Sequence, residues 1–347
     1  MTLLFEPLSI RGLTLRNRVM MSPMCQWSAD ESGIARDWHL VHYGSRAVGG
    51  VGLVMVEATA VESRGRISQH DLGLWDDSQL AGLAKIVDFC HAHGAAVAVQ
   101  LAHAGRKAWS GGLGFGPDVP VGPSEIPFDE GWRTPHALTA TELGGIVEAF
   151  ASAARRASQA GFDVIELHGA HGYLISEFLS PLANQRQDDF GGDHAGRARF
   201  GLAVVDAVRA EWDDRPLFIR LSCTDWSPGG NEPADAVEFA RRFSARGVDL
   251  VDCSSGGVVA TGPGPLSMTP SYQVGFAAQV RREAPVPTAA VGRITEPAQA
   301  AGIVDAGQAD IVALGRALLA DPHWPLHAAR TLGIDVPWPV AYQAASR

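Results

Sequence analysis

Short apolar runs rich in β-branched residues recur along the chain and alternate with longer amphipathic stretches. The apolar runs predict eight buried strands, at residues 18–24, 51–56, 95–101, 164–167, 217–221, 248–253, 286–291 and 311–314. The amphipathic stretches predict eight helices, at residues 37–47, 78–93, 139–160, 195–212, 233–246, 272–283, 297–305 and 324–332. Thr139 followed by Glu142 is a capping-box pattern, which supports a helix start there. Such alternation in 347 residues indicates an α/β fold, a single (β/α)8 TIM barrel spanning residues 1–347.

A doubly wound open sheet is the competing interpretation of alternating strands and helices. That fold would be favoured by a Gly-x-Gly-x-x-Gly turn after the first strand, and the sequence following residue 24 has none. No low-complexity tract or linker divides the chain, so we expect one domain.

Two segments lie outside the repeating pattern. Alternating runs at 8–10 and 13–15 flank an Arg-Gly turn, which predicts an N-terminal β-hairpin. After the third strand, residues 106–138 form a long loop rich in glycine and proline, which we expect to be a lid over the site. This loop carries the aromatic residues Trp109, Phe115, Phe128 and Trp132.

Composition and charge narrow the class of protein. The formal charge of -10 argues against nucleic-acid binding, because phosphate binding usually needs a basic surface. No apolar run approaches the roughly 18 to 20 residues that span a bilayer, and the N-terminus lacks the segments of a signal peptide. The four cysteines lie too far apart in sequence for a C-x-x-C motif. We therefore expect a cytoplasmic enzyme with no nucleic-acid or membrane partner.

The fourth predicted strand leads into the most informative stretch of the chain. His168, His171 and Tyr173 follow it within six residues. The imidazoles could donate hydrogen bonds to one ligand oxygen, and the phenol could offer a proton. Two alternatives remain open at this point: the histidines could be metal ligands, or loop residues bonded to neighbouring backbone.

Other predicted strands also end in chemically useful residues, and in a barrel these ends meet at one mouth. The residues concerned are Ser22, Pro23, Met24, Cys25, Trp27, Glu57, Ala58, Thr59, Gln100, His103, Arg220, Ser254, Ser255, Gly292, Arg293, Gly315 and Arg316. The Gly-Arg pairs at 292–293 and 315–316 follow strands seven and eight, where many barrels bind phosphate. Arg316 could clamp such an anion with two N–H groups.

Arg220 lies within an apolar strand, in the phase that faces the barrel interior or its mouth. A buried guanidinium needs an acceptor, because an unpaired buried charge costs several kcal/mol. We expect either an internal carboxylate, such as Glu57 or Glu166, or an electron-rich cofactor ring to serve.

Taken together, the motifs resemble the Old Yellow Enzyme family, most closely its bacterial thermophilic-like subclass of NADPH dehydrogenases and xenobiotic reductases. The matching stretches are Ser-Pro-Met-Cys at 22–25, Ala58, Gln100, His-Ala-Gly-Arg-Lys at 103–107, His-Gly-Ala-His-Gly-Tyr at 168–173, Glu-Phe-Leu-Ser-Pro-Leu at 177–182, Asn184, Arg220 and Gly-Arg at 315–316. They occur over nearly the whole chain.

The resemblance implies an FMN-dependent ene-reductase, in which NADPH reduces the flavin and an α,β-unsaturated carbonyl compound is then reduced at its C=C bond. Ser22, Pro23, Met24, Cys25 and Ala58 would line the flavin. Gln100 and Arg220 would bond the pyrimidine side of its ring, and Arg220 would stabilise the reduced form. Gly315 and Arg316 would hold the phosphate, and the strand-end pattern described above adds Gly292 and Arg293 in the neighbouring loop.

The resemblance also implies roles around the substrate. His168 and His171 would donate to its carbonyl oxygen, and Tyr173 would protonate the α-carbon. Cys25 would lie near flavin and substrate as a modulator of redox potential, and Lys107 in the lid would close on the site.

Two departures from the subclass pattern qualify these implications. Trp27 stands where a substrate-contacting tyrosine is usual, so we expect an altered substrate preference. Residues 342–344 lack the arginine that several relatives insert into a neighbouring subunit. We expect a homo-oligomer, either a dimer or a tetramer.

Two other classes of function are weighed against this one. A metal-dependent lyase or hydrolase would use His168, His171 and a carboxylate such as Glu166 as ligands. A non-catalytic barrel would leave the polar residues at the strand ends without a purpose.

Overall fold

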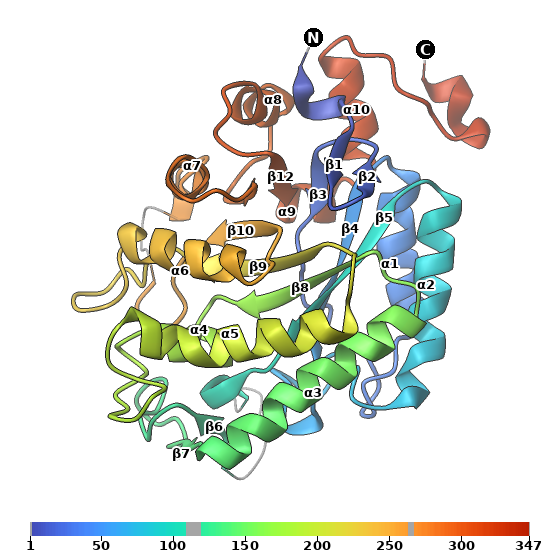
Figure 1. Cartoon of the computed structure of the whole chain (residues 1–347). Helices are drawn as coiled ribbons and strands as arrows, with labels where there is room; N and C mark the ends of the chain where they lie inside the picture. The colour runs from blue at the N-terminus through green and yellow to red at the C-terminus, as the bar shows by residue number, and fades with distance from the viewer. Residues whose placement is uncertain (1, 109–118, 263–266, 347) are drawn as a thin grey trace.

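The computed structural model describes residues 2–108, 119–262 and 267–346 (Figure 1). Its centre is a closed barrel of parallel strands, and the predicted α/β barrel is confirmed. In barrel order the strands are β3 (Val19–Met21), β4 (Leu53–Ala60), β5 (Ala96–Ala102), β8 (Val164–Gly169), β9 (Leu217–Ser222), β10 (Leu250–Ser254), β11 (Thr288–Ala290) and β12 (Ile311–Leu314). Each predicted strand is present, although β3 and β11 are shorter than the apolar runs that predicted them.

Amphipathic helices form the outer layer. They are α1 (Asp37–Val48), α2 (Leu80–Ala92), α3 (Ala140–Gln159), α5 (His194–Glu211), α6 (Pro233–Ala245), α7 (Val274–Glu283), α8 (Pro297–Asp305) and α10 (Trp324–Thr331). The capping box at the start of α3 is present, with Glu142 N–H donating to the Thr139 side chain. Two short helices, α4 (Leu174–Leu179) and α9 (Arg316–Ala320), follow β8 and β12 directly. In the parts of the chain that are described, no helix is long and apolar enough to cross a membrane.

The N-terminal hairpin closes one end of the barrel, as the alternating runs predicted. Its strands, β1 (Leu8–Ile10) and β2 (Leu13–Leu15), pair antiparallel. Ile10 and Leu15 are buried against the inward-facing apolar residues of the barrel. These include Met20, Leu53, Met55, Ala98, Val164, Phe218, Leu250, Ala289, Ile311 and Ala313. These apolar residues fill the hairpin end of the barrel and form its apolar floor. The polar groups lie at the opposite end, where the strands terminate.

The long loop after β5 folds back on that polar end. Its described part includes two short parallel strands, β6 (Val121–Gly122) and β7 (His136–Ala137), which Figure 1 places far from the hairpin. Phe128 and Trp132 pack edge to face, with centroids 4.8 Å apart. Two aromatic residues that we expected in this lid, Trp109 and Phe115, lie outside the described residues.

Candidate active site

Three side chains gather where β8 gives way to a loop. The rings of His168 and His171 have centroids 5.2 Å apart and are nearly perpendicular, at 86°. The ring of Tyr173 lies 4.9 Å from that of His168, at 68°. The structure therefore brings these three residues together, as their spacing predicted.

The loop that carries them has a tight backbone. His171 adopts a positive φ of 61°, and Gly172 follows with a φ of 66°. A Cβ atom on Gly172 would lie 2.1 Å from the carbonyl oxygen of Gly257, so only glycine fits this close approach. The contact fixes the β8 loop against the loop that follows β10.

Hydrogen bonds engage one imidazole and leave the other open. Nε2 of the His171 ring lies 2.7 Å from Ser254 Oγ, and the backbone N–H of His171 donates to Ser222 Oγ at 2.9 Å. Nδ1 of His168 is buried and has no hydrogen-bond partner in the part of the chain that is described. A buried polar atom without a hydrogen bond costs roughly 1–3 kcal/mol, and a ligand that bonds this nitrogen would remove that cost.

The two imidazoles and the phenol are neutral near pH 7, and each can donate a hydrogen bond. Burial lowers the pKa of both His168 and His171 well below the usual range, and the positive charge of Arg220 lowers both further. Each imidazole is therefore neutral near pH 7 and keeps one N–H. Burial raises the pKa of Tyr173 far above that of a free phenol, so its proton is retained.

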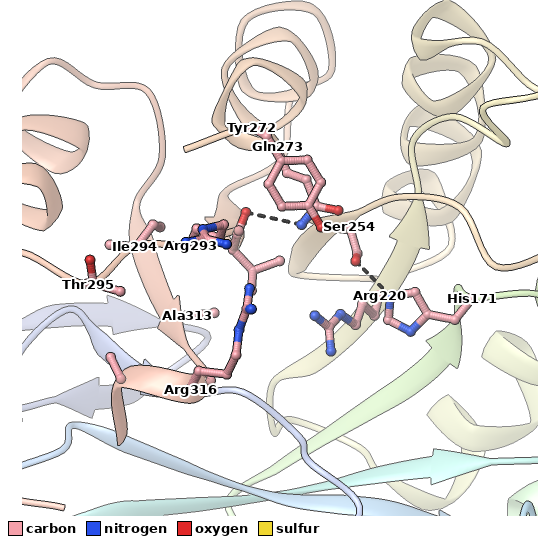
Figure 2. A pocket seen from close by; sticks show the side chains of 14 residues that line it. His171, Arg220, Ser254, Tyr272, Gln273, Arg293, Ile294, Thr295, Ala313 and Arg316 are labelled. Atoms are coloured by element: carbon pink, nitrogen blue, oxygen red, sulfur yellow. Dashed lines mark hydrogen bonds between the residues drawn. The ribbon is translucent and has the colours of Figure 1, made fainter. Parts of the chain in front are cut away.

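A cavity of about 430 Å³ opens beside these residues. Figure 2 shows arginine side chains around it, with His171 and Ser254 next to Arg220. Its lining consists of His171, Arg220, Ser254, Tyr272, Gln273, Val291, Gly292, Arg293, Ile294, Thr295, Ala313, Gly315, Arg316 and Ala317. Three of these are arginines and none is a carboxylate, counting described residues only. The cavity thus suits an anionic ligand.

The residues expected to hold a cofactor lie on two halves of the barrel mouth. Arg220, Gly292, Arg293, Gly315 and Arg316 line the cavity. The other expected residues, at or after the ends of β3, β4 and β5, are Ser22, Pro23, Met24, Cys25, Ala58 and Gln100. The halves meet where a Cβ atom on Gly315 would lie 3.5 Å from the sulfur of Met24.

Tyr272 and Gln273 were not expected in the site. The helix predicted from residue 272 begins at Val274, which leaves both residues in the preceding loop facing the cavity. Gly292 has a φ of 125°, and a Cβ atom there would lie 3.1 Å from the Tyr272 ring. The sequence pattern placed both residues inside the helix, because it predicted the helix start two residues too early.

The ion-pair partner of Arg220 is Asp252. We had expected Glu57 or Glu166, and neither of them forms this ion pair. Arg220 Nε lies 3.0 Å from Asp252 Oδ2, because the two residues stand opposite each other in the register of β9 and β10. The side chain of Glu57 contacts helix α1. Its carboxyl group accepts a hydrogen bond from Tyr43 of α1 at 2.8 Å, and the register of β4 shifts next to it, between Val56 and Ala58. Glu166 instead accepts from Gln100 Nε2 at 2.8 Å.

Cys25 and Trp27 lie on the loop after β3. Cys25 is a half-buried free thiol, and burial raises its pKa, with the carboxyl groups of Asp71 and Glu57 adding to the shift. It is therefore protonated near pH 7. The Trp27 side chain is 61% exposed at the edge of the loop, so it can contact only a ligand that reaches this edge.

Lys107, at the start of the long loop after β5, reaches the loop that follows β8. Its ammonium group donates to the carbonyl oxygens of His171 at 2.9 Å and Gly257 at 3.1 Å. It lies 4.5 Å from the centre of the Phe128 ring and 4.8 Å from that of Tyr173. Burial lowers the pKa of Lys107 to about 8.

The metal-dependent alternative needs three ligands in one place. Within the described ranges, no group of three or more His, Cys, Asp or Glu residues is arranged to hold a metal ion. The third ligand considered, Glu166, is fully buried and bonded to Gln100.

Comparison with known proteins decides the family. The model of the NADH:flavin oxidoreductase / NADH oxidase family matches residues 3–334. The chain belongs to this family. An NADPH dehydrogenase from Geobacillus thermodenitrificans is 50% identical, over 100% of this chain and 99% of the relative. The structure of morphinone reductase is 31% identical with a TM-score of 0.80, over 97% of this chain and 91% of that one. The Old Yellow Enzyme homologue of Zymomonas mobilis is 25% identical with a TM-score of 0.80, over 97% and 94% of the two chains.

The expected family, FMN cofactor and nicotinamide reductant are thereby confirmed for this flavin oxidoreductase. The residues at the barrel mouth fit FMN on physical grounds. Arg293 and Arg316 supply positive charge for a phosphate, and Gly292 leaves room beside Tyr272. Arg220 brings a buried cation to the wall nearest His171.

Proposed function

We propose that this flavin oxidoreductase is an ene-reductase, which uses NADPH to reduce the C=C bond of α,β-unsaturated carbonyl compounds. The observation that carries the proposal is the buried Nδ1 of His168, which has no hydrogen-bond partner among the described residues and lies beside His171 and Tyr173. His171 in turn lines the cavity that holds the three arginines. NADPH is inferred as the reductant because the most similar relatives reported above include an NADPH dehydrogenase at 50% identity.

The chain's own residues would bind and orient the substrate. His168 and His171, both neutral, would donate hydrogen bonds to the carbonyl oxygen and draw electron density from the β-carbon. His171 is held in place by Ser254 while it does so. Bound FMN supplies the hydride. By fixing the orientation of the substrate, these hydrogen bonds would lower the activation free energy by several kcal/mol.

Tyr173 would deliver the proton to the α-carbon. Its phenol is protonated across the physiological range, because burial raises its pKa. The ring lies 4.9 Å from His168, so an alkene whose carbonyl oxygen is bound by the imidazoles passes within reach of the phenol. Cys25, a protonated thiol, would adjust the redox potential and take no part as a nucleophile.

The test is a separation of the two half-reactions. Purified protein is reduced anaerobically with NADPH, and the loss of flavin absorbance is recorded. An α,β-unsaturated ketone such as 2-cyclohexenone is then added. The proposal expects reoxidation of the flavin with formation of the saturated ketone. Flavin that is reduced by NADPH but is reoxidised only by oxygen would refute it.

We also propose a single FMN-binding domain over residues 1–347, a cytoplasmic location and a homo-oligomer, either a dimer or a tetramer. Because residues 342–344 carry no arginine, a neighbouring subunit would contribute no guanidinium from this position. Light scattering at several protein concentrations tests the oligomeric state, and unfolding followed by fluorescence and by flavin release tests whether one unit unfolds.

A further inference from the structure

Four polar side chains form a layer inside the barrel, directly above its apolar floor. They are Gln100, Glu166, Arg220 and Asp252, and we call them the inner polar layer. Each lies two positions after an inward-facing apolar residue of the same strand, namely Ala98, Val164, Phe218 and Leu250. Strand register pairs Gln100 with Glu166 and Arg220 with Asp252. Strand alternation therefore points all four into the barrel.

The charges of this layer do not balance. Two carboxyl groups, Glu166 and Asp252, are 0% exposed and share one guanidinium, that of Arg220, which is 6% exposed. With every group ionised, the layer would carry one uncompensated negative charge far from water. Such a charge is costly in a protein interior, so one carboxyl group keeps its proton.

The contacts identify which carboxyl group this is. Burial raises the pKa of Asp252, but its Oδ2 stands 3.0 Å from Nε of Arg220, whose positive charge opposes that rise and favours the anion. Glu166 has no such ion pair and accepts only from the neutral amide of Gln100. Among described residues, Oε2 of Glu166 and both oxygens of Asp252 are buried without a hydrogen-bond partner, so the ion pair is what distinguishes the two groups. The neighbouring group on its own strand, His168, is itself neutral.

We propose that Glu166 is held protonated near pH 7 and is a positioning residue for Arg220. When Glu166 is neutral, Asp252 is the one anion of the inner polar layer beside the guanidinium. The positive potential of Arg220 that Asp252 does not cancel then acts on the ligand in the cavity. An ionised Glu166 would add negative charge beneath that ligand and cancel part of this field. The inference rests on FMN occupying the cavity that Arg220 lines, which membership of the family supports, and not on the nature of the oxidised substrate.

The titration behaviour agrees with this assignment. Burial raises the pKa of Glu166 to about 8, and the negative charge of Asp252 raises it further while Arg220 opposes the shift. Electrons gained by a flavin beside Arg220 would favour the proton on Glu166 still more. Reduction would therefore take up a proton at Glu166 when the pH lies above about 8.

The test compares the wild type with Glu166→Gln, which mimics the protonated carboxyl group. The midpoint potential of bound flavin is measured by dye equilibration from about pH 6 to about pH 10. In the wild type, the potential should fall more steeply with pH in a window that begins near pH 8, and in Glu166→Gln this steep window should be absent. Glu177→Gln is the matched control, because Glu177 is also a buried carboxyl group with a pKa raised to about 8, and it should retain the window.

Superimposable potential curves for the wild type and Glu166→Gln would overturn the proposal. A second measurement needs no FMN. Infrared spectra of the cofactor-free wild type should show C=O bands of protonated carboxylic acids near pH 7, from Glu166 and from Glu57 and Glu177, whose pKa values burial also raises to about 8. One of these bands should be missing from Glu166→Gln and kept in Glu177→Gln. A wild-type spectrum with no such band near pH 7, or an unchanged set of bands in Glu166→Gln, would overturn the proposal. Neither readout depends on alkene reduction, so failure of the proposed function would be recognised separately.

Discussion

The ammonium group of Lys107 lies 4.8 Å from the centre of the Tyr173 ring and donates to the backbone carbonyl of His171. One side chain from the base of the lid thus touches the loop that carries the proposed proton donor. The same ammonium group also bonds Gly257, in the loop after β10. Lys107 therefore ties together three segments that are far apart in the sequence.

Replacing Lys107 by Met should slow alkene reduction while flavin reduction by NADPH changes little. Loss of the two hydrogen bonds removes charge-assisted contacts worth roughly 1.5–3 kcal/mol, so we expect the oxidative half-reaction to slow by about 10- to 100-fold. Stopped-flow measurement of each half-reaction provides the comparison. Lys107→Arg should recover part of the rate, because its N–H groups can reach one of the carbonyls. Equal loss in both half-reactions would point to a general disturbance of the fold.

Replacing Tyr173 by Phe removes the phenol and keeps the ring that packs against His168. A general acid contributes about 10²–10⁴-fold to a rate, so alkene reduction should slow by a factor in this range. The rate of flavin reduction should stay close to that of the wild type. Product formed in D₂O would also show less stereospecific deuterium at the α-carbon. A variant in which both half-reactions slow alike would exclude Tyr173 as the proton donor.

The order of elements could be predicted because each strand and helix has a local cause. Strands such as Val164–Leu167 are continuous apolar runs, and the start of α3 is marked by the capping box of Thr139. His168, His171 and Tyr173 could be grouped because they lie within six residues of one another, at the end of β8 and in the loop that follows it. Pairing between strands is different, since it depends on barrel register. Asp252 was not among the partners expected for Arg220, and it is identified only by the alignment of β9 and β10.

The sequence does contain a sign that Asp252 could pair with Arg220. It is one of two aspartates in the predicted strand at 248–253, the other being Asp249, whereas Arg220 is the one cation in its own predicted strand. Matching opposite charges on consecutive strands would have made Asp252 a candidate partner of Arg220. The direction of the Glu57 side chain could not be predicted in this way, because the register shift between Val56 and Ala58 is a feature of the pairing of β4 with β5.

Replacing Arg316 by Ala should weaken the binding of FMN and spare that of riboflavin. Arg316 lines the cavity with Gly315 at the start of α9, where the phosphate is expected. Loss of a charge-assisted contact of roughly 1.5–3 kcal/mol corresponds to about a 10- to 100-fold weaker Kd. Titration of cofactor-free protein with each ligand, followed by flavin fluorescence, gives the two affinities. Arg199→Ala is a control on the outer surface, and it should change neither. A similar loss for both ligands would place the phosphate elsewhere.

Replacing Trp27 by Tyr should alter substrate preference without abolishing activity. The indole is 61% exposed at the edge of the loop that carries Cys25, so it would meet the outer part of a large substrate and spare a small one. We expect kcat/KM to change by about threefold or more for bulky enones, with less change for 2-cyclohexenone. Measuring kcat/KM over a series of ring substituents tests this. An unchanged ranking of substrates would remove Trp27 from the substrate site.

Glu177 gives a prediction for stability against pH. Burial raises its pKa to about 8, and its Oε1 accepts a hydrogen bond from the Arg106 N–H at 2.9 Å. The unfolded chain loses this proton near pH 4.5, whereas the folded chain keeps it up to about pH 8. The folded state therefore binds more protons in this interval, and the contribution of Glu177 to the free energy of unfolding falls as the pH rises through it.

Glu177→Gln cannot ionise and keeps an oxygen that can accept from Arg106. Relative to the wild type, its free energy of unfolding should improve by roughly 1 kcal/mol or more between about pH 5 and about pH 8. Urea titrations at several pH values measure the difference between the two proteins, which cancels the contribution of all other titrating groups. A difference that is constant with pH would mean that Glu177 titrates equally in the folded and unfolded chains, and a difference that falls with pH would reverse the sign deduced from its burial.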